Sequence, residues 1–250
     1  METPVVMYVH ISGRPRRNFI FRAIRHMQTS GVKSMQLRGD LLRQMQWWIN
    51  SLSSRRAPSS YFWKRQPDTP LVCSDASGED GWGACAMGLH IAGPWPREWQ
   101  QSAGAGAPHM LFKEMLAPVV TSLLLAPFVP GAVFACATDN AGAAFVLNSL
   151  SCACPETLKL LRPLSDGLTR AGVGLVADHA HRERNAHTDD LSHALPMRLW
   201  SRCVAQAQPA RHAAHTMVHF AIMDTATGEA FTASMSFPRL FVRGARDEAP

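Results

Sequence analysis

The order of short apolar runs and amphipathic stretches between residues 70 and 195 constrains the fold more than any other feature. Three runs follow one another with only turn residues between them, which predicts an antiparallel meander. Two more runs each follow a helical stretch, which predicts strands reached by crossovers. The five runs span residues 70–74, 82–88, 89–95, 131–139 and 173–179. We therefore expect an α/β fold with a mixed five-stranded sheet and helices packed against it.

Helices are predicted between and around these strands. Residues 109–126 form a long apolar stretch, and 155–172 begins with proline and ends with glycine, as helices often do. Shorter helices are expected at 140–150 and from residue 185 onward. The Ala- and Gly-rich stretch 100–108 is expected to be a flexible loop. Before the sheet, a basic helix is expected at 14–28, and apolar residues at helical spacing predict a second helix at 37–52, which contains a Trp-Trp pair.

The charge is unevenly distributed along the chain. Residues 1–70 hold 12 Lys/Arg against 3 Asp/Glu, a formal charge of +9, whereas residues 71–250 carry −3. Such a basic portion suggests a phosphate-rich partner, the alternative being a solvated basic surface. Within it, aromatic residues at 61–63 are interleaved with cations that could follow a sugar–phosphate backbone, namely Arg55, Arg56, Lys64 and Arg65.

These shifts in composition divide the chain into three parts. We expect a basic connecting segment at 1–69, a sheet domain at 70–200 and a C-terminal extension at 201–250 whose role is open. The extension contains a candidate hairpin at 219–237 that turns at Thr227-Gly228.

Several other classes of protein are disfavoured. No run of eighteen apolar residues occurs, so no membrane span or membrane partner is expected. The N-terminus lacks the pattern of a signal peptide. The six cysteines are scattered, which favours reduced thiols in an intracellular protein. The sequences CAC at 152–154 and HAH at 179–181 fit known zinc spacings poorly, so we favour a structural role for these cysteines.

Four carboxylates are predicted to meet at one edge of the sheet. Asp75 ends the first strand and Asp139 ends the fourth, while Glu114 interrupts an apolar helix and Asp189 lies near the start of the last helix. Functional groups gather outside strand ends in open sheets. Four converging carboxylates repel one another unless cations lie between them, and oxygen ligands favour Mg²⁺. Such a cluster, holding two metal ions, performs in-line phosphodiester displacement.

Each carboxylate also has a simpler interpretation when taken alone. Asp75 could be a turn residue, and Asp139 could be the N-cap of the following helix. Asp189 could favour a helix N-terminus through the dipole. No simple local role of this kind explains Glu114, because its neighbours on the helix are apolar.

These motifs together resemble the ribonuclease H domain of retroelement reverse transcriptases. The matching stretches, in the family's order, are SDASGEDGWGA (74–84), KEMLA (113–117), TDNAGAAFVL (138–147) and DHAHRERNAHTDDLS (178–192). The TDN form, the N-x-x-x-D-x-L-S pattern and the upstream Trp-Trp helix are most similar to tyrosine-recombinase (DIRS-like) retrotransposons.

The resemblance implies a ribonuclease-H-like fold with helices on both faces of the sheet. It further implies that Asp75, Glu114, Asp139 and Asp189 bind two Mg²⁺ ions, for which Mn²⁺ may substitute, and that His179 assists proton transfer or release of product and metal. Asn140 and Asn185 would contact nucleic acid. Asp190 competes with Asp189 for the last metal-binding position, although the spacing from His179 and Asn185 favours Asp189.

Three functions are compatible with this pattern. The first is a metal-dependent endonuclease that cuts the RNA strand of an RNA–DNA hybrid. The second is a non-catalytic module of the same fold that only binds nucleic acid, and the third is a transposase or exonuclease of that fold. No polymerase motif such as Tyr-x-Asp-Asp occurs in the 250 residues, so a polymerase portion would be separate or missing.

Overall fold

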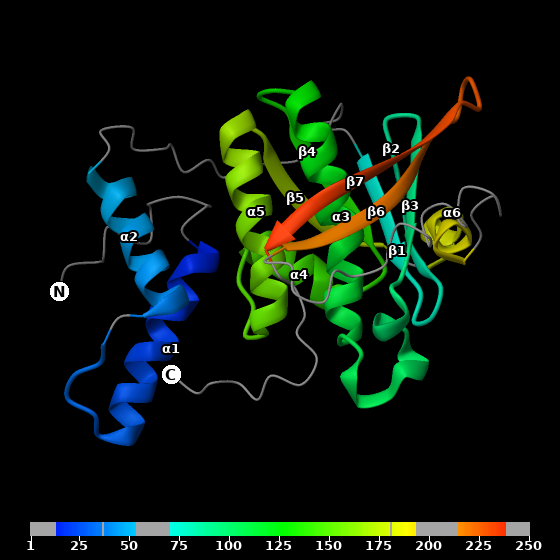
Figure 1. Cartoon of the computed structure of the whole chain (residues 1–250). Coiled ribbons are helices and arrows are strands. Elements are labelled where there is room, and N and C mark those ends of the chain that lie inside the picture. The colour runs from blue at the N-terminus through cyan, green and yellow to red at the C-terminus, as the bar shows by residue number, and fades with distance from the viewer. Residues whose placement is uncertain (1–13, 37, 54–70, 181, 194–214, 239–250) are drawn as a thin grey trace.

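The computed structural model describes residues 14–36, 38–53, 71–180, 182–193 and 215–238. Its centre is a seven-stranded mixed sheet with the strand order β5-β4-β1-β2-β3-β6-β7. The strands are β1 (Leu71–Ala76), β2 (Gly81–Ala86), β3 (Leu89–Pro94), β4 (Val133–Thr138), β5 (Gly174–His179), β6 (His215–Asp224) and β7 (Ala230–Pro238). Figure 1 shows this sheet between two layers of helices.

The first five strands form the predicted arrangement. β1, β2 and β3 make an antiparallel meander, and β4 and β5 run parallel to β1 on its other side. The α/β class and the mixed pairing are therefore confirmed.

The expected strand count of five is wrong, because the sheet has seven strands. The predicted C-terminal hairpin exists, and its first strand pairs antiparallel with β3. Gly228 adopts a positive φ of 72° in the turn between β6 and β7, a conformation that glycine accepts without strain. The hairpin thus covers an edge of β3 that would otherwise present unpaired backbone groups.

The helices after the meander cover the two faces of the sheet. α3 (Met110–Leu125), α4 (Ala141–Ser149) and α5 (Pro155–Ala171) lie on one side, and α6 (Arg182–His193) lies on the other (Figure 1). Pro155 stands at the first position of α5, and Gly172 ends that helix with a φ of 66°, as the sequence predicted. α6 begins at Arg182, earlier than expected.

The two faces of the central strands differ in the size of their side chains. Large apolar residues fill the side of α3, where Trp82 contacts Phe220 at a ring-centroid distance of 6.0 Å. The opposite face carries Gly83 where α6 crosses it, and a β-carbon there would come within 2.6 Å of the Leu191 β-carbon. The absence of a side chain at Gly83 therefore allows α6 to pack closely on β2.

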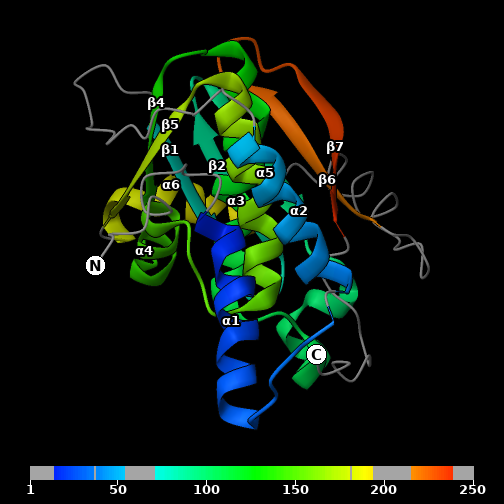
Figure 2. The ribbon, with the colours of Figure 1, turned by 90° about the vertical axis from the view of Figure 1, so that its left-hand side faces the viewer.

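The basic N-terminal segment contains both expected helices, α1 (Arg14–Ser30) and α2 (Gly39–Ser53). Figure 2 shows them beside α5, on the side of the molecule away from α6. The stretch around residues 100–108 is not simply a loop, because Gln101–Gly106 form a short 3-10 helix, η4. The Ser102 amide and hydroxyl bond to the Glu79 carboxylate there, which fixes η4 against the β1–β2 turn.

One described segment, Met110–Phe128, is long and apolar enough to cross a membrane by length and composition. However, 72% of its most apolar window is buried inside the protein, as in the core helix of a globular fold. It includes α3 and carries Glu114 to the edge of the sheet.

Candidate active site

Three of the predicted carboxylates come together at one end of the central strands. Asp75 lies near the end of β1, Asp139 directly follows β4, and Glu114 comes from α3. One oxygen from each of the three lies within 4.8 Å of the others. Asp75 and Glu114 are each only 6% exposed.

The strand register explains why Asp75 and Asp139 are neighbours. β1 and β4 are parallel and adjacent, and Ser74 is paired with Thr138. The next residue of each strand therefore reaches the same edge of the sheet. The structure also settles the alternative interpretation of Asp139, because the N-cap of α4 is Asn140, whose side chain accepts a hydrogen bond from the Ala143 amide at 3.0 Å.

The cluster is electrostatically strained when no cation is bound. Burial, followed by repulsion from Asp75 and Asp139, raises the pKa of Glu114 to about 8. Burial and the charge of Asp139 raise the pKa of Asp75 to about 6, with Asp189 adding to the shift and Ser192 opposing it. Among the described residues, Glu114 Oε2 is buried without a hydrogen-bond partner. An unpartnered buried carboxylate oxygen is costly unless a cation or a proton compensates it.

The donor set fits a hard divalent cation. All three groups offer carboxylate oxygens, which Mg²⁺ and Mn²⁺ bind in preference to softer ligands. Asp75, Glu114 and Asp139 are therefore the residues that could hold such an ion.

Asp189 approaches this cluster from the opposite face of the sheet. Its charge is one of the causes of the raised Asp75 pKa, although it does not belong to the group of three. Ser192 Oγ lies between Asp75 and Asp189, 3.1 Å from Asp75 Oδ2 and 2.8 Å from the Asp189 backbone carbonyl. A hydroxyl has one proton, so it can donate to only one of these at a time. Asp189 is half-buried, whereas Asp190 is exposed.

Asn185 fixes α6 to the sheet. It is 2% exposed, and its Nδ2 donates to the Ser74 carbonyl at 2.9 Å, next to Asp75 in the chain. This bond holds α6 over the strand that carries the first carboxylate. The expected contact of Asn185 with nucleic acid stays a prediction, as does that of Asn140, whose side-chain oxygen caps α4.

His179 is the last residue of β5 and is exposed. Its Nε2 lies 3.0 Å from the backbone carbonyl of Asp139, to which Nε2–H donates. The imidazole is thus at the rim of the cluster. Four predicted phosphate-binding residues lie outside the described part of the chain, namely Arg55, Arg56, Lys64 and Arg65.

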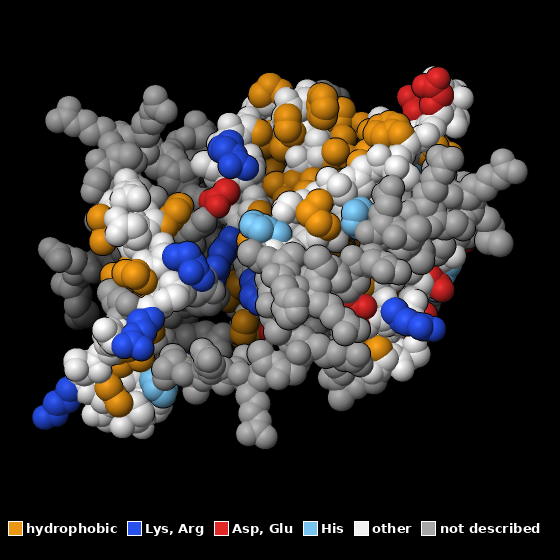
Figure 3. Space-filling view, viewed as in Figure 1, with side chains coloured by type: hydrophobic (Ala, Val, Ile, Leu, Met, Phe, Trp, Pro, Cys, Tyr) orange, Lys and Arg blue, Asp and Glu red, His pale blue; other side chains and the backbone are white. Residues whose placement is uncertain are grey.

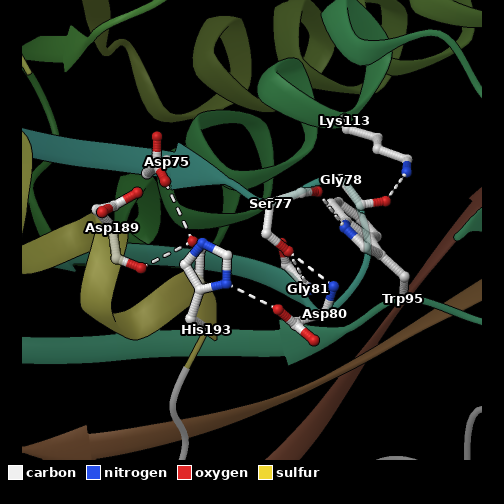
Figure 4. Close-up of polar contacts among 10 residues, drawn as sticks. Asp75, Ser77, Gly78, Asp80, Gly81, Trp95, Lys113, Asp189 and His193 are labelled. Carbon is white, nitrogen blue, oxygen red and sulfur yellow. Dashed lines mark hydrogen bonds and ion pairs between the residues drawn. The ribbon is translucent and has the colours of Figure 1, made fainter. Parts of the chain in front are cut away.

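Sequence reasoning gave no role to a group of residues that supports the turn after Asp75. The buried Lys113, the neighbour of Glu114 in α3, donates from Nζ to the Gly78 carbonyl at 2.5 Å and lies 5.6 Å from the centroid of the Trp95 ring. Trp95 in turn donates to the Ser77 carbonyl at 2.8 Å. Figure 4 shows both side chains converging on this turn. They join α3, and so Glu114, to the strand end that carries Asp75.

A second contact joins the other helix to the same turn. His193 Nδ1, at the end of α6, lies 2.7 Å from Asp80 Oδ2, and both side chains are about half exposed. Solvent screens such a pair, so its contribution is small. Nothing in the sequence pattern pointed to Asp80 and His193, because 113 positions separate them.

Comparison with known proteins finds solved structures of low similarity. RNase H1 from Halobacterium salinarum NRC-1 is 15% identical with a TM-score of 0.33, and the match covers 49% of this chain and 93% of that one. The native protease–reverse transcriptase of Prototype Foamy Virus is 13% identical with a TM-score of 0.38, covering 67% of this chain and 29% of that one. A foamy viral protease–reverse transcriptase in complex with an RNA/DNA hybrid is 12% identical with a TM-score of 0.35, covering 64% and 26%.

Sequence profiles of protein families give no match, and neither do curated proteins. The strand order and register decide the fold. The antiparallel meander, the parallel strand β4 beside β1 with β5 beside β4, and the helices on both faces are the arrangement that the motifs implied. The fold is ribonuclease-H-like. The matched part of this chain spans less than a third of the foamy viral chains.

Proposed function

We propose that this chain is a metal-dependent endonuclease that hydrolyses the RNA strand of RNA–DNA hybrids, and that it derives from a retroelement. The observation that carries the proposal is the cluster of Asp75, Glu114 and Asp139, with the partnerless Glu114 oxygen inside it. The four sequence motifs, which resemble ribonuclease H domains of retroelements, support the choice of substrate.

The carboxylates have distinct parts in this proposal. Asp75 and Asp139 would hold Mg²⁺ directly, Glu114 would bind the same ion and orient the attacking water, and Asp189 would complete a second ion site together with Asp75. Bound divalent ions supply acidity to the water and stabilise the leaving oxygen. Ser192 holds one oxygen of Asp75, which limits the rotation of that carboxylate.

His179 would take part in proton transfer at the rim of the site. Its exposed ring donates to the Asp139 carbonyl, which places the imidazole beside the carboxylate cluster and in reach of solvent and product. We expect His179→Ala to slow turnover by about ten- to a hundredfold, as for a positioned acid–base group.

The basic segment would hold the phosphates of the hybrid. In Figure 3, Lys and Arg side chains are seen mainly over α1, α2 and the adjoining part of α5. Arg25 and Lys33 are among the exposed cations there. Contacts between Lys or Arg and phosphates release counterions, which raises the affinity of the protein for nucleic acid independently of base sequence.

A substrate panel tests the proposal. The purified full-length chain is incubated with labelled RNA–DNA hybrid, duplex RNA and duplex DNA in Mg²⁺, Mn²⁺, Ca²⁺ or chelator. We expect cleavage of the RNA strand of the hybrid with Mg²⁺ or Mn²⁺, and none with Ca²⁺, whose larger and looser shell misplaces the water.

The other outcomes distinguish the rival functions. Binding of hybrid without cleavage in any metal would favour the non-catalytic module. Preferential cleavage of duplex DNA would favour a transposase or exonuclease of this fold. Full activity in chelator would contradict metal catalysis altogether.

A further inference from the structure

A second group of potential metal ligands lies on the face of the sheet that α6 covers. Cys85 of β2, His90 of β3 and His187 of α6 each offer one ligand atom, and these three atoms lie within 4.8 Å of one another. The two imidazoles meet at Nε2, with a separation of 3.0 Å and a ring-centroid distance of 4.7 Å.

The fold, rather than a local motif, assembles this group. Cys85 and His90 are directly paired in the β2–β3 ladder, so their side chains leave the same face of the sheet. The close packing of α6 on Gly83 brings the helix over this face and places His187 above the pair.

The separation of the two imidazole nitrogens is close to that in a tetrahedral zinc site. Two imidazole nitrogens bound to one zinc ion at 2.0–2.1 Å lie roughly 3.3 Å apart. The observed 3.0 Å between His90 Nε2 and His187 Nε2 needs only a small adjustment to admit an ion. Among the described residues, His90 Nδ1 is buried with no hydrogen-bond partner, and the ring contacts His187 through Nε2.

We propose that Cys85, His90 and His187 form a second metal site that takes a transition-metal ion of the zinc class and fastens α6 to β2 and β3. The donors are one sulfur and two imidazole nitrogens, a set that selects zinc-like ions over Mg²⁺. The carboxylate cluster, in contrast, offers only oxygens. The inference does not depend on the proposed nuclease activity.

The remaining coordination position opens toward solvent. His187 is exposed, so an ion can enter from its side, and water can supply the fourth ligand. Burial and the nearby Cys73 raise the pKa of the Cys85 thiol to about 12. The incoming ion therefore displaces a proton from Cys85, and that proton passes to the buffer.

A metal ion at this site would hold α6 in place over the sheet. That helix carries Asp189 and Ser192 to the carboxylate cluster, and His187 lies two residues before Asp189. An ion bound by β2, β3 and α6 at once adds a link between the helix and the central strands. Metal that binds only the folded state raises its stability by mass action.

Metal binding by the full-length chain tests this inference. The protein is stripped with chelator, exchanged into excess Mg²⁺ to saturate the carboxylates, and titrated with Zn²⁺ or Co²⁺. We expect one equivalent of Zn²⁺ to bind and to raise the melting temperature. Co²⁺ should give the thiolate-to-cobalt charge-transfer absorption, which a carboxylate site does not produce.

Matched variants locate the site. His187→Ala and Cys85→Ser should each weaken Zn²⁺ binding at least tenfold, and Cys85→Ser should abolish the charge-transfer band. His193→Ala removes another exposed histidine from α6, and Cys152→Ser removes a thiol from outside the group, so both should bind Zn²⁺ like the wild type.

Two results would overturn the inference. One is a wild-type chain that binds no Zn²⁺ at micromolar concentrations in the presence of Mg²⁺. The other is a His187→Ala variant that binds Zn²⁺ as tightly as the wild type. Because His187 is exposed, its removal should leave the fold intact even if Cys85→Ser disturbs the sheet.

Discussion

Asp189 and Asp190 show at the scale of single residues how position decides chemistry. Asp189 is half-buried, and its charge raises the pKa of Asp75, whereas Asp190 is exposed. The sequence left the two as alternatives. The orientation of α6 favours Asp189 as the metal-binding group, since it faces the cluster.

This difference predicts the effects of two conservative substitutions. Asp189→Asn removes a ligand charge and should lower hybrid cleavage by about a hundredfold or more, because metal binding contributes several kcal/mol to the transition state. Asp190→Asn is the matched control and should stay within about twofold of the wild type, since it changes only a solvated charge. Initial cleavage rates at saturating Mg²⁺ measure both. The reverse order of the two effects would assign the role to Asp190.

The raised pKa values of Asp75 and Glu114 predict how the stability of the metal-free protein depends on pH. Their folded pKa values of about 6 and about 8 exceed the values of roughly 4 expected in the unfolded chain. The folded state therefore binds more protons between these limits, and its stability falls as pH rises through about 6 and then about 8. Urea unfolding in chelator at pH 5.5 and pH 9 measures this loss.

Removal of the titrating group provides the control for this effect. Glu114→Gln cannot ionise, so its urea midpoint should fall less between pH 5.5 and pH 9 than that of the wild type. Added Mg²⁺ should raise the wild-type midpoint at pH 9 and have a smaller effect on the variant. An identical pH dependence in the two proteins would show that the fold does not raise the pKa of Glu114.

At the scale of elements, local sequence patterns were sufficient for the first five strands and for most helices. Alternation and turn residues predicted β1 to β3, and Pro155 and Gly172 marked the two ends of α5. Asp75, Glu114 and Asp139 could be expected to meet because strand ends and one helix face fix them. These features depend on neighbours in the sequence or on parallel pairing, both of which leave local signals.

Long-range packing left no such signal. The pairing of β6 with β3 joins segments more than 100 residues apart, and nothing local in either strand specifies the partner. The grouping of Cys85, His90 and His187 depends on the same kind of packing, because α6 must cross β2 at one particular position along the strand. The support that Lys113 gives to the Gly78 turn was missed because a lysine in a helix is usually solvated.

Gly83 controls how closely α6 approaches the sheet, and its substitution is predicted to affect stability and activity together. In Gly83→Ala the new methyl group would lie 2.6 Å from the Leu191 β-carbon and 2.9 Å from the Ser192 amide nitrogen. The helix must move outward, at a cost of about 1–3 kcal/mol, as in other overpacked cores. Urea unfolding and hybrid cleavage should both decline, since Asp189 moves with the helix.

Ala84→Gly is the control for this prediction. Ala84 lies on the same strand but faces away from α6, and it is fully buried. Its loss of a methyl group should lower stability while leaving cleavage by the folded protein close to wild type. If Gly83→Ala lost stability but kept full activity, the position of α6 would not matter for the reaction.

At the scale of the whole molecule, the C-terminal hairpin is part of the sheet. Phe220 and Phe237 are buried in the main core, and β6 pairs with the edge of β3. A chain that ends at residue 200 should therefore expose this edge and aggregate or unfold. A chain that ends at residue 240 keeps both strands and should remain monodisperse in gel filtration. A soluble, stable product ending at residue 200 would show that the hairpin is dispensable.

The charge of the N-terminal segment predicts the salt dependence of hybrid binding. Replacing Arg55, Arg56, Lys64 and Arg65 together with Gln should weaken binding and make the plot of log affinity against log salt shallower by up to about 0.9 for each lost phosphate contact. Cleavage at saturating hybrid should persist, because the carboxylates are unchanged. Equal affinity and equal salt slope in the two proteins would mean that these charges are merely solvated.

The central claim is that the carboxylate cluster holds the metal ions that cleave the RNA strand. Its most direct test is the rate of Mg²⁺-dependent cleavage of an RNA–DNA hybrid by wild type and by Asp75→Asn, with melting curves measured in parallel. We predict no detectable cleavage by the variant and a metal-free stability equal to or above wild type, since the substitution removes a repelling charge and almost no volume. Cleavage by Asp75→Asn close to the wild-type rate would contradict the account.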